Sequence, residues 1–312
     1  RNSSSQPFTY SRTIQCRDHS NLIMNETDNL SNKELKALIS LLEDDDAEVL
    51  SHVEGKIKSL GTHIIPYLEF EWEGSFNPTV QKRIEELVHS LQFQLLKEKL
   101  EAWKETGGED LLEGMWLVNT YQYPDLEYAD LKKQLEQIYY EAWLEFKTDV
   151  HPVDQVKILN SVIFNKLKFG ANTKNFHSPG NSMMSVVLQT KKGNPVSLCI
   201  IYALVAQKLK LPIHGVNLPN LFVLTYKQGE TQFYINAFNR GLIFSRKEID
   251  DYVANLKLTP KDQYYEPCTN VDMVVRVLRN LSIAHEKLGN SEKVDEIKSL
   301  IEILADKTAD LE

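Results

Sequence analysis

The feature that most constrains this fold is a helix-forming segment near the middle of the chain, "NPVSLCIIYALVAQKLK". A Gly-Pro-type turn opens it, and the run "CIIYALVA" is continuously apolar. A helix that is apolar on nearly all sides must be surrounded by other elements. We therefore predict a central core helix over about 197–209. Its expected buried side chains are Leu198, Ile201, Tyr202, Leu204 and Val205.

The clearest strand signals follow this helix and are short. The runs "LFVLTY", "TQFYINAF" and "GLIFS" are rich in β-branched and aromatic residues, and the turns "KQGE" and "NR" join them. They predict a meander or hairpin. Helical spacing dominates elsewhere, and predicts helices at about 46–60, 77–104, 109–121, 126–147, 152–168, 248–256, 271–288 and 291–306. The fold class is mostly α with a small α+β core.

The apolar pattern also suggests how the chain is divided. Val49, Val53, Ile57 and Leu60 recur 31 residues later as Val80, Ile84, Val88 and Leu91. A period of this length with paired helices is similar to HEAT-like repeats. Residues 1–23 lack periodicity, and Met24 is interpreted as a natural start. The predicted divisions are a flexible extension (1–23), HEAT-like paired helices (24–106), a helical part of the core (107–168), an α+β core (169–258) and a tetratricopeptide-like helical tail (259–312).

Charge and cysteine usage limit the classes of partner. The net charge of −9 argues against nucleic acid. Residues 155–229 carry nine lysines and no Asp, Glu or Arg, so the rest of the chain carries −18. This asymmetry indicates either an anion site or a basic core surrounded by the chain's own acidic flanks. Three widely spaced cysteines and the lack of a long apolar run predict a cytoplasmic protein with no membrane association.

The central segment resembles a known family. The residues "NSMMSVVLQTKKGNPVSLCIIYALVAQKLKLPIHGVNLPNLFVL" with "FYINAFNRG" resemble the transglutaminase-like core of the bacterial Sir-B type regulator family, over about 110–305. The resemblance implies a papain-like layout. In that layout a nucleophile begins the central helix, a histidine lies on the first strand and an acid lies on the second.

This chain departs from the enzyme pattern at all three places. The nucleophile position reads Ser197, where the family commonly has Ser and true transglutaminases have Cys. We interpret Ser197 as a helix cap. The family's Pro-Gly-His-Phe reads Pro219-Asn220-Leu221-Phe222, so Leu221 replaces the histidine, and Asn236 replaces the acid of Asp-Pro-Phe. Leu221 cannot accept a proton. The chain is therefore predicted to be a pseudoenzyme with vestigial triad positions.

Other residues could carry chemistry instead. Cys199 lies in the first turn of the central helix, where a thiol's pKa could be lowered, and His214 or His177 could assist it. Against this, a cysteine in an apolar run is usually a buried hydrophobe. No zinc spacing, dinucleotide fingerprint or phosphate loop is present, so no metal and no cofactor are expected.

We therefore predict a non-catalytic transglutaminase-like module that binds or scaffolds, possibly in regulation. Its partner would be a protein or peptide, or an anionic small molecule held by ligand-binding candidates at the vestigial cleft: Lys174, Lys191, Lys192, Asn220 and Asn236. The alternative is an atypical cysteine or serine hydrolase or acyltransferase that uses Cys199 or Ser197.

Overall fold

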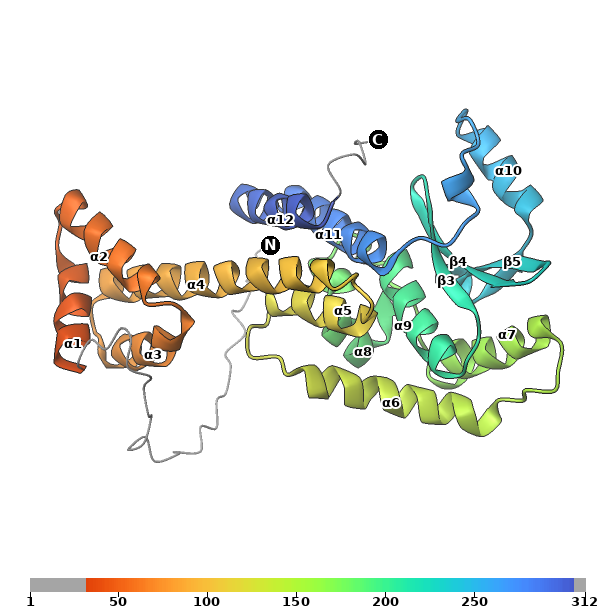
Figure 1. Ribbon diagram of the computed structural model, residues 1–312, viewed down its shortest axis with the longest axis horizontal. Helices are drawn as coiled ribbons and strands as arrows, with labels where there is room; N and C mark the ends of the chain where they lie inside the picture. The colour runs from red at the N-terminus through yellow and green to blue at the C-terminus, as the bar shows by residue number, and fades with distance from the viewer. Residues whose placement is uncertain (1–31, 306–312) are drawn as a thin grey trace, which may run out of the picture. The chain divides into compact units, whose positions relative to one another are not determined.

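The computed structural model describes residues 32–305, so the predicted extension at 1–23 and Cys16 lie outside the described residues. Contacts divide the chain into two compact units, of which the first ends at Val88 and the second begins at His89. Helix α4 (Pro78–Glu105) carries the chain from one unit into the other (Figure 1).

The first unit is helical throughout its described part. It contains α1 (Asn32–Ser40), α2 (Ala47–Ser59), α3 (Ile65–Gly74), the beginning of α4, and two 3₁₀ turns at Leu41–Glu43 and Thr62–Ile64. Helix α2 begins at Asp46, whose side chain accepts the N–H groups of Glu48 and Val49, and the chain turns at Gly61 with φ +77°. The repeat positions Val53 and Ile84 are buried, as an apolar helical face requires. The HEAT-like pairing itself stays a prediction.

The second unit combines helices with one sheet. Its helices are α5 (Leu111–Thr120), α6 (Tyr128–Glu145), α7 (Pro152–Asn160), α8 (Met184–Thr190), α9 (Pro195–Lys208), α10 (Arg246–Asn255), α11 (Asn270–Lys287) and α12 (Ser291–Leu304). Helix α7 continues as a π-helical turn, Ser161–Lys166. The mostly helical class with a small antiparallel sheet is confirmed.

The sheet is a four-stranded antiparallel meander in chain order: β3 (Ile213–Leu218), β4 (Leu221–Gln228), β5 (Thr231–Asn236) and β6 (Leu242–Phe244). The three predicted runs correspond to β4, β5 and β6, whereas β3 was not predicted. Asn220 ends the two-residue turn between β3 and β4 with φ +58°. Asn and Gly tolerate this left-handed conformation. A separate parallel pair joins β1 (Gly170–Ala171) to β2 (Lys192–Gly193).

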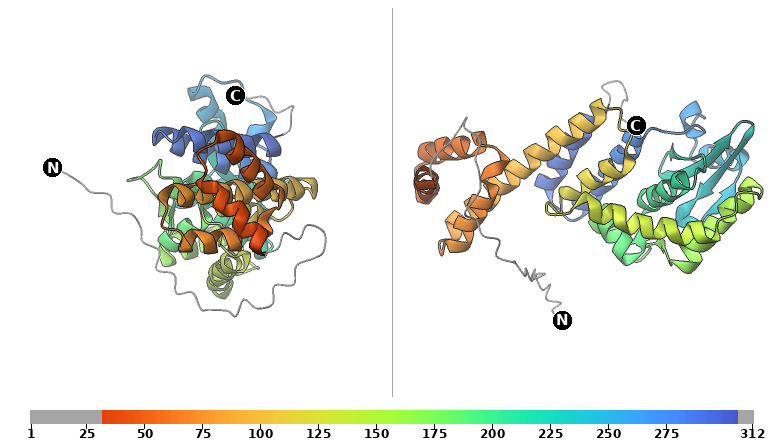
Figure 2. Two further views of the ribbon diagram at one scale, coloured as in Figure 1. Left: turned by 90° about the vertical axis from the view of Figure 1, so that its left-hand side faces the viewer. Right: turned by 60° about the horizontal axis from the view of Figure 1, so that its bottom comes forward.

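Helix α9 lies at the centre of the second unit, as its apolar sequence predicts. It packs against β3, β4, α6 and α11 (Figure 2). Leu198, Ile201, Tyr202 and Val205 are buried. The prediction for Leu204 was wrong, because this side chain is only half-buried and lines a surface groove.

One amide joins three segments beneath this helix. The hydroxyl of Tyr202 donates to Asn160 Oδ1 (3.0 Å), and Asn160 Nδ2 donates to the carbonyl of Gly241 (2.8 Å). Gly241 has φ +77°, and a Cβ there would overlap the Asn160 amide. Position 241 therefore requires glycine, and the turn before β6 is fixed to α7 and α9.

The tail consists of α11 and α12, which pack together, and the chain turns between them at Gly289 with φ +74°. The carboxylate of Glu296 on α12 receives hydrogen bonds from Tyr121 (2.8 Å) and His89 (2.6 Å). These bonds fasten α12 to α4 and to the end of α5. The likeness to a tetratricopeptide unit stays a prediction. Among residues 32–305, no helix has the length and apolar character needed to span a bilayer.

Candidate functional site

The residue that resembles the family nucleophile lies inside a capping box. Asn194 is the N-cap of α9, and its Oδ1 accepts the backbone N–H of Ser197 (3.0 Å). In return, Ser197 Oγ accepts the N–H of Asn194 (3.1 Å) and donates to the Asn194 carbonyl (3.1 Å). Ser197 therefore does cap the helix, but from the third helical position, and Asn194 holds the N-cap position.

This hydroxyl is enclosed as well as bonded. Ser197 is 1% exposed. A Cβ at Gly193 would lie 2.5 Å from Ser197 Oγ and 3.0 Å from Val187 Cγ1, so only glycine fits beside it. Within residues 32–305, neither an imidazole nor a carboxylate is hydrogen-bonded to Ser197 Oγ. The hydroxyl thus both donates and accepts within the helix end, with no base beside it to take its proton.

A network of amides closes the loop that precedes this helix. Asn194 Nδ2 donates to Ser182 Oγ (3.0 Å). The side chain of Asn181 accepts from Asn172 Nδ2 (2.8 Å) and donates to the carbonyls of Asn175 (2.7 Å) and Phe176 (2.9 Å). Asn181, Ser182 and Asn194 are all buried. Buried amides with satisfied partners hold loops rigidly. We therefore interpret these three residues as ones that stabilise the loop before α9.

The alternative nucleophile Cys199 is fully buried, at 0% exposure. Its thiol donates to the carbonyl of Phe222 at 3.6 Å. Burial raises the pKa of the Cys199 thiol well above its ordinary value, and a smaller opposing effect comes from a backbone hydrogen bond at Ala237. Burial likewise raises the pKa of the Cys268 thiol to about 12. Neither thiol is a thiolate near neutral pH, and the thiolate is the nucleophilic form.

Leu221 and Asn236 lie on the face of the sheet opposite α9. Leu221 packs against the smaller hydrophobic cluster, which contains Val223 of β4 and Ile249 of α10. Phe222, the next residue, packs in the main core with Cys199. Since side chains alternate along a strand, Leu221 points toward α10. Asn236 follows the same alternation on β5.

Asn236 also has a structural partner. Its Oδ1 accepts the N–H of Asn239 (3.1 Å) and caps the 3₁₀ turn Ala237–Asn239. The structure thus places the three positions that resemble a triad in different local roles: a capping box for Ser197, apolar packing for Leu221 and a turn cap for Asn236.

Neither candidate histidine is hydrogen-bonded to Ser197 or Cys199. His214 lies on β3. It alternates with Ile213 of the main core and so shares the α10 face with Val216. Burial lowers the pKa of His214. His177 is exposed, and its Nε2 lies 2.7 Å from Lys287 Nζ.

The ligand-binding candidates are dispersed over several elements. Lys191 places its ammonium 4.5 Å from the centre of the Phe169 ring, and burial lowers its pKa. Lys174, Lys192 and Asn220 are exposed. Four of the nine lysines in residues 155–229 form ion pairs with carboxylates outside that segment: Lys157, Lys166, Lys208 and Lys227. These pairs favour a basic core matched by the chain's own acidic flanks.

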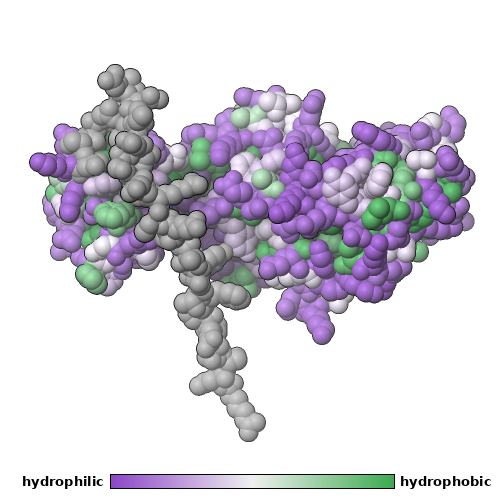
Figure 3. All heavy atoms as spheres, turned by 90° about the horizontal axis from the view of Figure 1, so that it is seen from below, coloured by the Kyte–Doolittle hydropathy of each residue, from purple (hydrophilic) through white to green (hydrophobic). Residues whose placement is uncertain are grey.

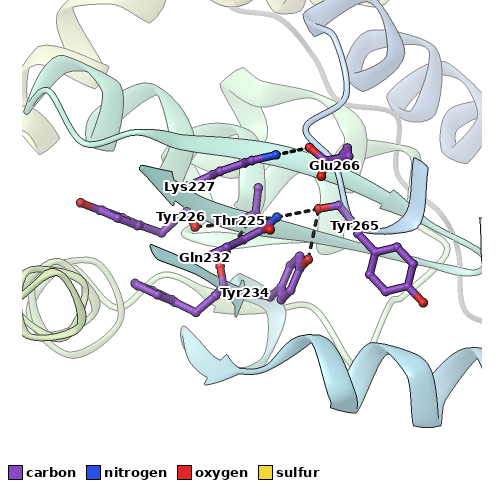
Figure 4. A network of polar contacts seen from close by, with 8 residues as sticks. Thr225, Tyr226, Lys227, Gln232, Tyr234, Tyr265 and Glu266 are labelled. Atoms are coloured by element: carbon purple, nitrogen blue, oxygen red, sulfur yellow. Dashed lines mark hydrogen bonds and ion pairs between the residues drawn. The ribbon is translucent and has the colours of Figure 1, made fainter. Parts of the chain in front are cut away.

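The second face of the sheet is closed by polar contacts that sequence reasoning missed (Figure 4). The carbonyl of Tyr265 accepts from Gln232 Nε2 (2.8 Å) and from the hydroxyl of Tyr234 (3.1 Å), and Lys227 pairs with Glu266. Arg246 lies over the Tyr265 ring at 3.8 Å. These contacts hold the segment that precedes α11 against β4 and β5. Hydrogen bonds from side chains to a backbone carbonyl leave no periodic pattern in the sequence, so they could not be predicted from it.

A groove opens elsewhere in this unit, between α6 and α9. It has a volume of about 220 Å³ and an apolar floor made by Leu112, Leu135, Leu204 and Val205. Tyr139, Lys132 and the ion pair of Lys208 with Glu136 (3.2 Å) lie along it. None of the predicted site residues lines this groove. Leu204 and Val205 are the predicted core residues of α9 that line it, and of these two only Leu204 is partly exposed.

Comparison with known proteins agrees with the central resemblance. Residues 129–279 match a family described as "Transglutaminase-like superfamily", so this part of the chain is similar to a transglutaminase-like domain. It is 28% identical over 196 residues to a UPF0162 protein of Xylella fastidiosa, covering 59% of this chain and 67% of that protein.

The relatives include an animal protein. The chain is 28% identical over 151 residues to F-box only protein 21 of Mus musculus, covering 46% of this chain and 23% of that protein. It is 26% identical over 181 residues to a UPF0162 protein of Vibrio cholerae, covering 56% of this chain and 66% of that protein. No solved structure matched the chain.

Proposed function

We propose that the transglutaminase-like domain of this chain acts without catalysis, as a binding or scaffold module. One observation carries the proposal. The hydroxyl at the place that resembles the family nucleophile is 1% exposed and is bonded only within the start of its own helix. A nucleophile needs an adjacent base and access to substrate, and Ser197 has neither.

The other family positions support the same proposal. Leu221 offers no proton acceptor and packs toward α10, and the Asn236 amide is engaged by Asn239. Loss of triad members commonly lowers the rate by several powers of ten. A domain with such residues is retained for its shape and surface. We expect its partner to be a protein or peptide.

The rival proposal is an atypical hydrolase or acyltransferase that uses Cys199 or Ser197. The enclosed thiol at position 199, its raised pKa and its hydrogen bond to Phe222 all disfavour it. An anionic small molecule at Lys174, Lys191, Lys192, Asn220 and Asn236 is a second variant of the binding role, and the contact of Lys191 with the Phe169 ring disfavours it.

Covalent labelling tests the proposal directly. The native chain would be treated with iodoacetamide and, separately, with a fluorophosphonate, and the modified residues mapped by mass spectrometry at several pH values. We expect negligible labelling of Cys199 and Ser197 in the native chain, and full alkylation of Cys199 after denaturation as the internal control. Rapid labelling of either residue below pH 7 would overturn the proposal and favour the enzyme.

A matched set of variants sharpens this test. Ser197→Cys alone is compared with the triple variant Ser197→Cys, Leu221→His and Asn236→Asp. Because residue 221 points toward α10, we expect the added imidazole to leave the alkylation rate of the new thiol unchanged. A rise of about tenfold or more in that rate at pH 6–7 would mean that the three positions still form a working site.

A further inference from the structure

Arg276 of α11 is a charged side chain to which the fold gives no counter-ion. Charged residues usually stay in contact with water, and hydrophilic residues (purple) cover most of the face that Figure 3 shows. Arg276 is instead partly buried, as is Arg279, one helical turn further along. Within residues 32–305 neither arginine forms an ion pair. Removing a charge from water without a partner costs free energy, so this guanidinium is a candidate for binding an anion.

The packing of α11 against β3 brings Arg276 to the sheet. Gly215 of β3 permits a close approach, because a Cβ there would lie 3.0 Å from Met273 Sδ. Asn217 lies on the same face of β3 as Gly215, since side chains alternate along a strand. Arg276 follows Met273 by three residues, which is nearly one helical turn. Its Nη1 donates a hydrogen bond to Asn217 Oδ1 at 3.0 Å.

This hydrogen bond leaves several donors without an acceptor. A guanidinium has five N–H groups, and the bond to Asn217 is the only one that Arg276 makes within residues 32–305. The same bond engages the amide oxygen of Asn217, whose Nδ2 has no partner in that part of the chain. The two side chains together offer N–H donors and a positive charge, a combination that suits an oxyanion.

The carboxylates of α11 do not neutralise Arg276. Asp272, four residues earlier, accepts the N–H (2.9 Å) and the hydroxyl (2.7 Å) of Thr269. Glu286 is exposed and lies ten residues further along, about 15 Å by the rise of an α-helix. Neither carboxylate is paired with Arg276 or Arg279 in the described part of the chain.

Helix α10 reaches the same end of the sheet through Tyr252. The Tyr252 hydroxyl donates to the carbonyl of Pro219, in the turn between β3 and β4 (2.7 Å). The carboxylate of Asp250 on this helix accepts the hydroxyl of Tyr265 (2.6 Å). Asp251 is exposed and, within residues 32–305, is not ion-paired. Helix α10 therefore contributes a hydroxyl near the arginine and no counter-ion.

The pKa of Arg276 agrees with this arrangement. Burial lowers the pKa of the guanidinium, the positive charge of Arg279 lowers it further, and Tyr252 opposes them. Among residues 32–305, no carboxylate contributes to the shift. The positive potential at Arg276 is therefore not compensated by the described part of the chain.

We propose that Arg276, Asn217 and Arg279 form a binding site for an oxyanion group of a ligand, a carboxylate or a phosphoryl group. The guanidinium of Arg276 would donate two parallel hydrogen bonds to two oxygens of this group. Asn217 Nδ2 would donate to one of the same oxygens, and Arg279 would add a second positive charge. Asn220, one of the predicted ligand-binding residues, lies in the adjoining turn.

This inference rests on the proposed binding role, for which it supplies a ligand chemistry. The two fail separately. Labelling at Ser197 or Cys199 does not involve Arg276, and an absence of anion binding at Arg276 would leave the labelling result unchanged.

NMR of the arginine side chains tests the inference on the full, ¹⁵N-labelled chain. The probes are sodium phosphate and sodium acetate, titrated separately near neutral pH at an ionic strength held constant with sodium chloride. We expect the Nε–Hε resonance of Arg276, assigned from its loss in Arg276→Lys, to shift with a dissociation constant of about 1 mM. Tighter binding of phosphate would identify a phosphoryl group as the ligand's anion, and tighter binding of acetate a carboxylate. The Nε–Hε resonance of Arg83, whose side chain donates to the carbonyls of Leu42 and Asp44, is the internal control.

One substitution fills the proposed site from within. Asn217→Asp places a carboxylate beside the Arg276 guanidinium, so we expect anion binding at least tenfold weaker and a melting temperature no lower than that of the parent chain. Arg276→Lys keeps the charge but loses the planar fork, and should also weaken binding about tenfold. The matched control is Lys298→Gln, which removes one exposed positive charge from α12 and should leave binding at Arg276 unchanged.

Three outcomes would overturn the inference. The first is no shift of the Arg276 resonance with either anion at about 50 mM. The second is an equal shift of the Arg83 resonance, which would indicate an effect of salt rather than a site. The third is unchanged anion binding in Asn217→Asp. Thermal unfolding shows whether that variant is folded, and Asn217→Ser, which removes the amide donors, replaces it if it is not.

Discussion

The start of α9 and the outer face of α6 use their conspicuous residues in opposite ways. At the start of α9, Asn194 and Ser197 are buried and bonded to each other. On α6, Tyr140 and Trp143 are exposed and have few partners in their own unit. A residue at a position that resembles a family's active site can therefore serve the fold, whereas Tyr140 and Trp143 contribute little burial to it.

The largest expected effect on stability comes from a substitution at the buried start of α9. Asn194→Ala removes the N-cap and leaves Ser182 Oγ and the Ser197 N–H without their amide partner. We expect the free energy of unfolding to fall by about 2–3 kcal/mol, measured by urea denaturation. Asn239→Ala, at an exposed position, is the control. A loss below about 0.5 kcal/mol would mean that the start of α9 is not rigidly closed.

A pH titration tests how a buried imidazole with one unpartnered nitrogen affects stability. His285 is 3% exposed, and its Nε2 has no hydrogen-bond partner among residues 32–305. Burial, with a smaller effect of Lys293, lowers the pKa of His285 from 6.5. Below pH 6.5 the unfolded chain then binds the proton first, so stability present above that pH is lost as pH falls through the folded pKa.

The size of this loss is at most about 1.4 kcal/mol per pH unit. Unfolding measured between pH 7.5 and 5 should show the decrease, and His285→Gln should reduce the slope. An unchanged slope in that variant would assign the pH dependence to other groups.

Ser197→Ala should have a smaller effect than Asn194→Ala. It removes one side of the capping box but leaves the Asn194 amide bonded to the N–H of residue 197. We expect a loss of about 1 kcal/mol by thermal unfolding. A loss as large as that of Asn194→Ala would mean that the Ser197 hydroxyl, and not the Asn194 amide, holds the start of α9.

The smallest effect on stability is expected on α6. Trp143→Ser should change the free energy of unfolding by no more than about 0.5 kcal/mol, since the side chain is 58% exposed. Urea denaturation of the variant and the parent chain gives this value. A loss of 2 kcal/mol or more would place Trp143 in the packing of its own unit and remove the contrast with Asn194.

Much of the fold could be predicted, because apolar spacing reports helices directly. The predicted helices at 271–288 and 291–306 match α11 and α12 to within two residues. Strand β3 was not among the predicted runs, because "IHGVNL" contains Gly215 and two polar residues within six positions. Helix α3 was missed because Pro66 interrupts its apolar run, although proline is tolerated in a first helical turn.

The candidate site was harder to predict than the fold. The pair Asn77-Pro78 is a typical helix start, and Asn77 Oδ1 accepts the N–H of Thr79 (3.0 Å). The same Asn-Pro signal at 194–195 would have assigned the N-cap of α9 to Asn194. The side of the sheet on which Leu221 lies depends on the register of β4, and a single sequence does not report register without the neighbouring strand.

The order of strands in the sheet has a consequence for how the chain assembles. Every strand pairs only with its neighbours along the chain, so the meander closes short loops and can form early. Helix α11 instead contacts residues far upstream in the sequence. Asn270 Nδ2 donates a hydrogen bond to the carbonyl of Gly108, 162 residues away. During synthesis, the sheet would emerge before α11 and α12 are made. The main core would then stay open on that side until α11 and α12 arrive, which makes the tail the step that completes folding of the second unit.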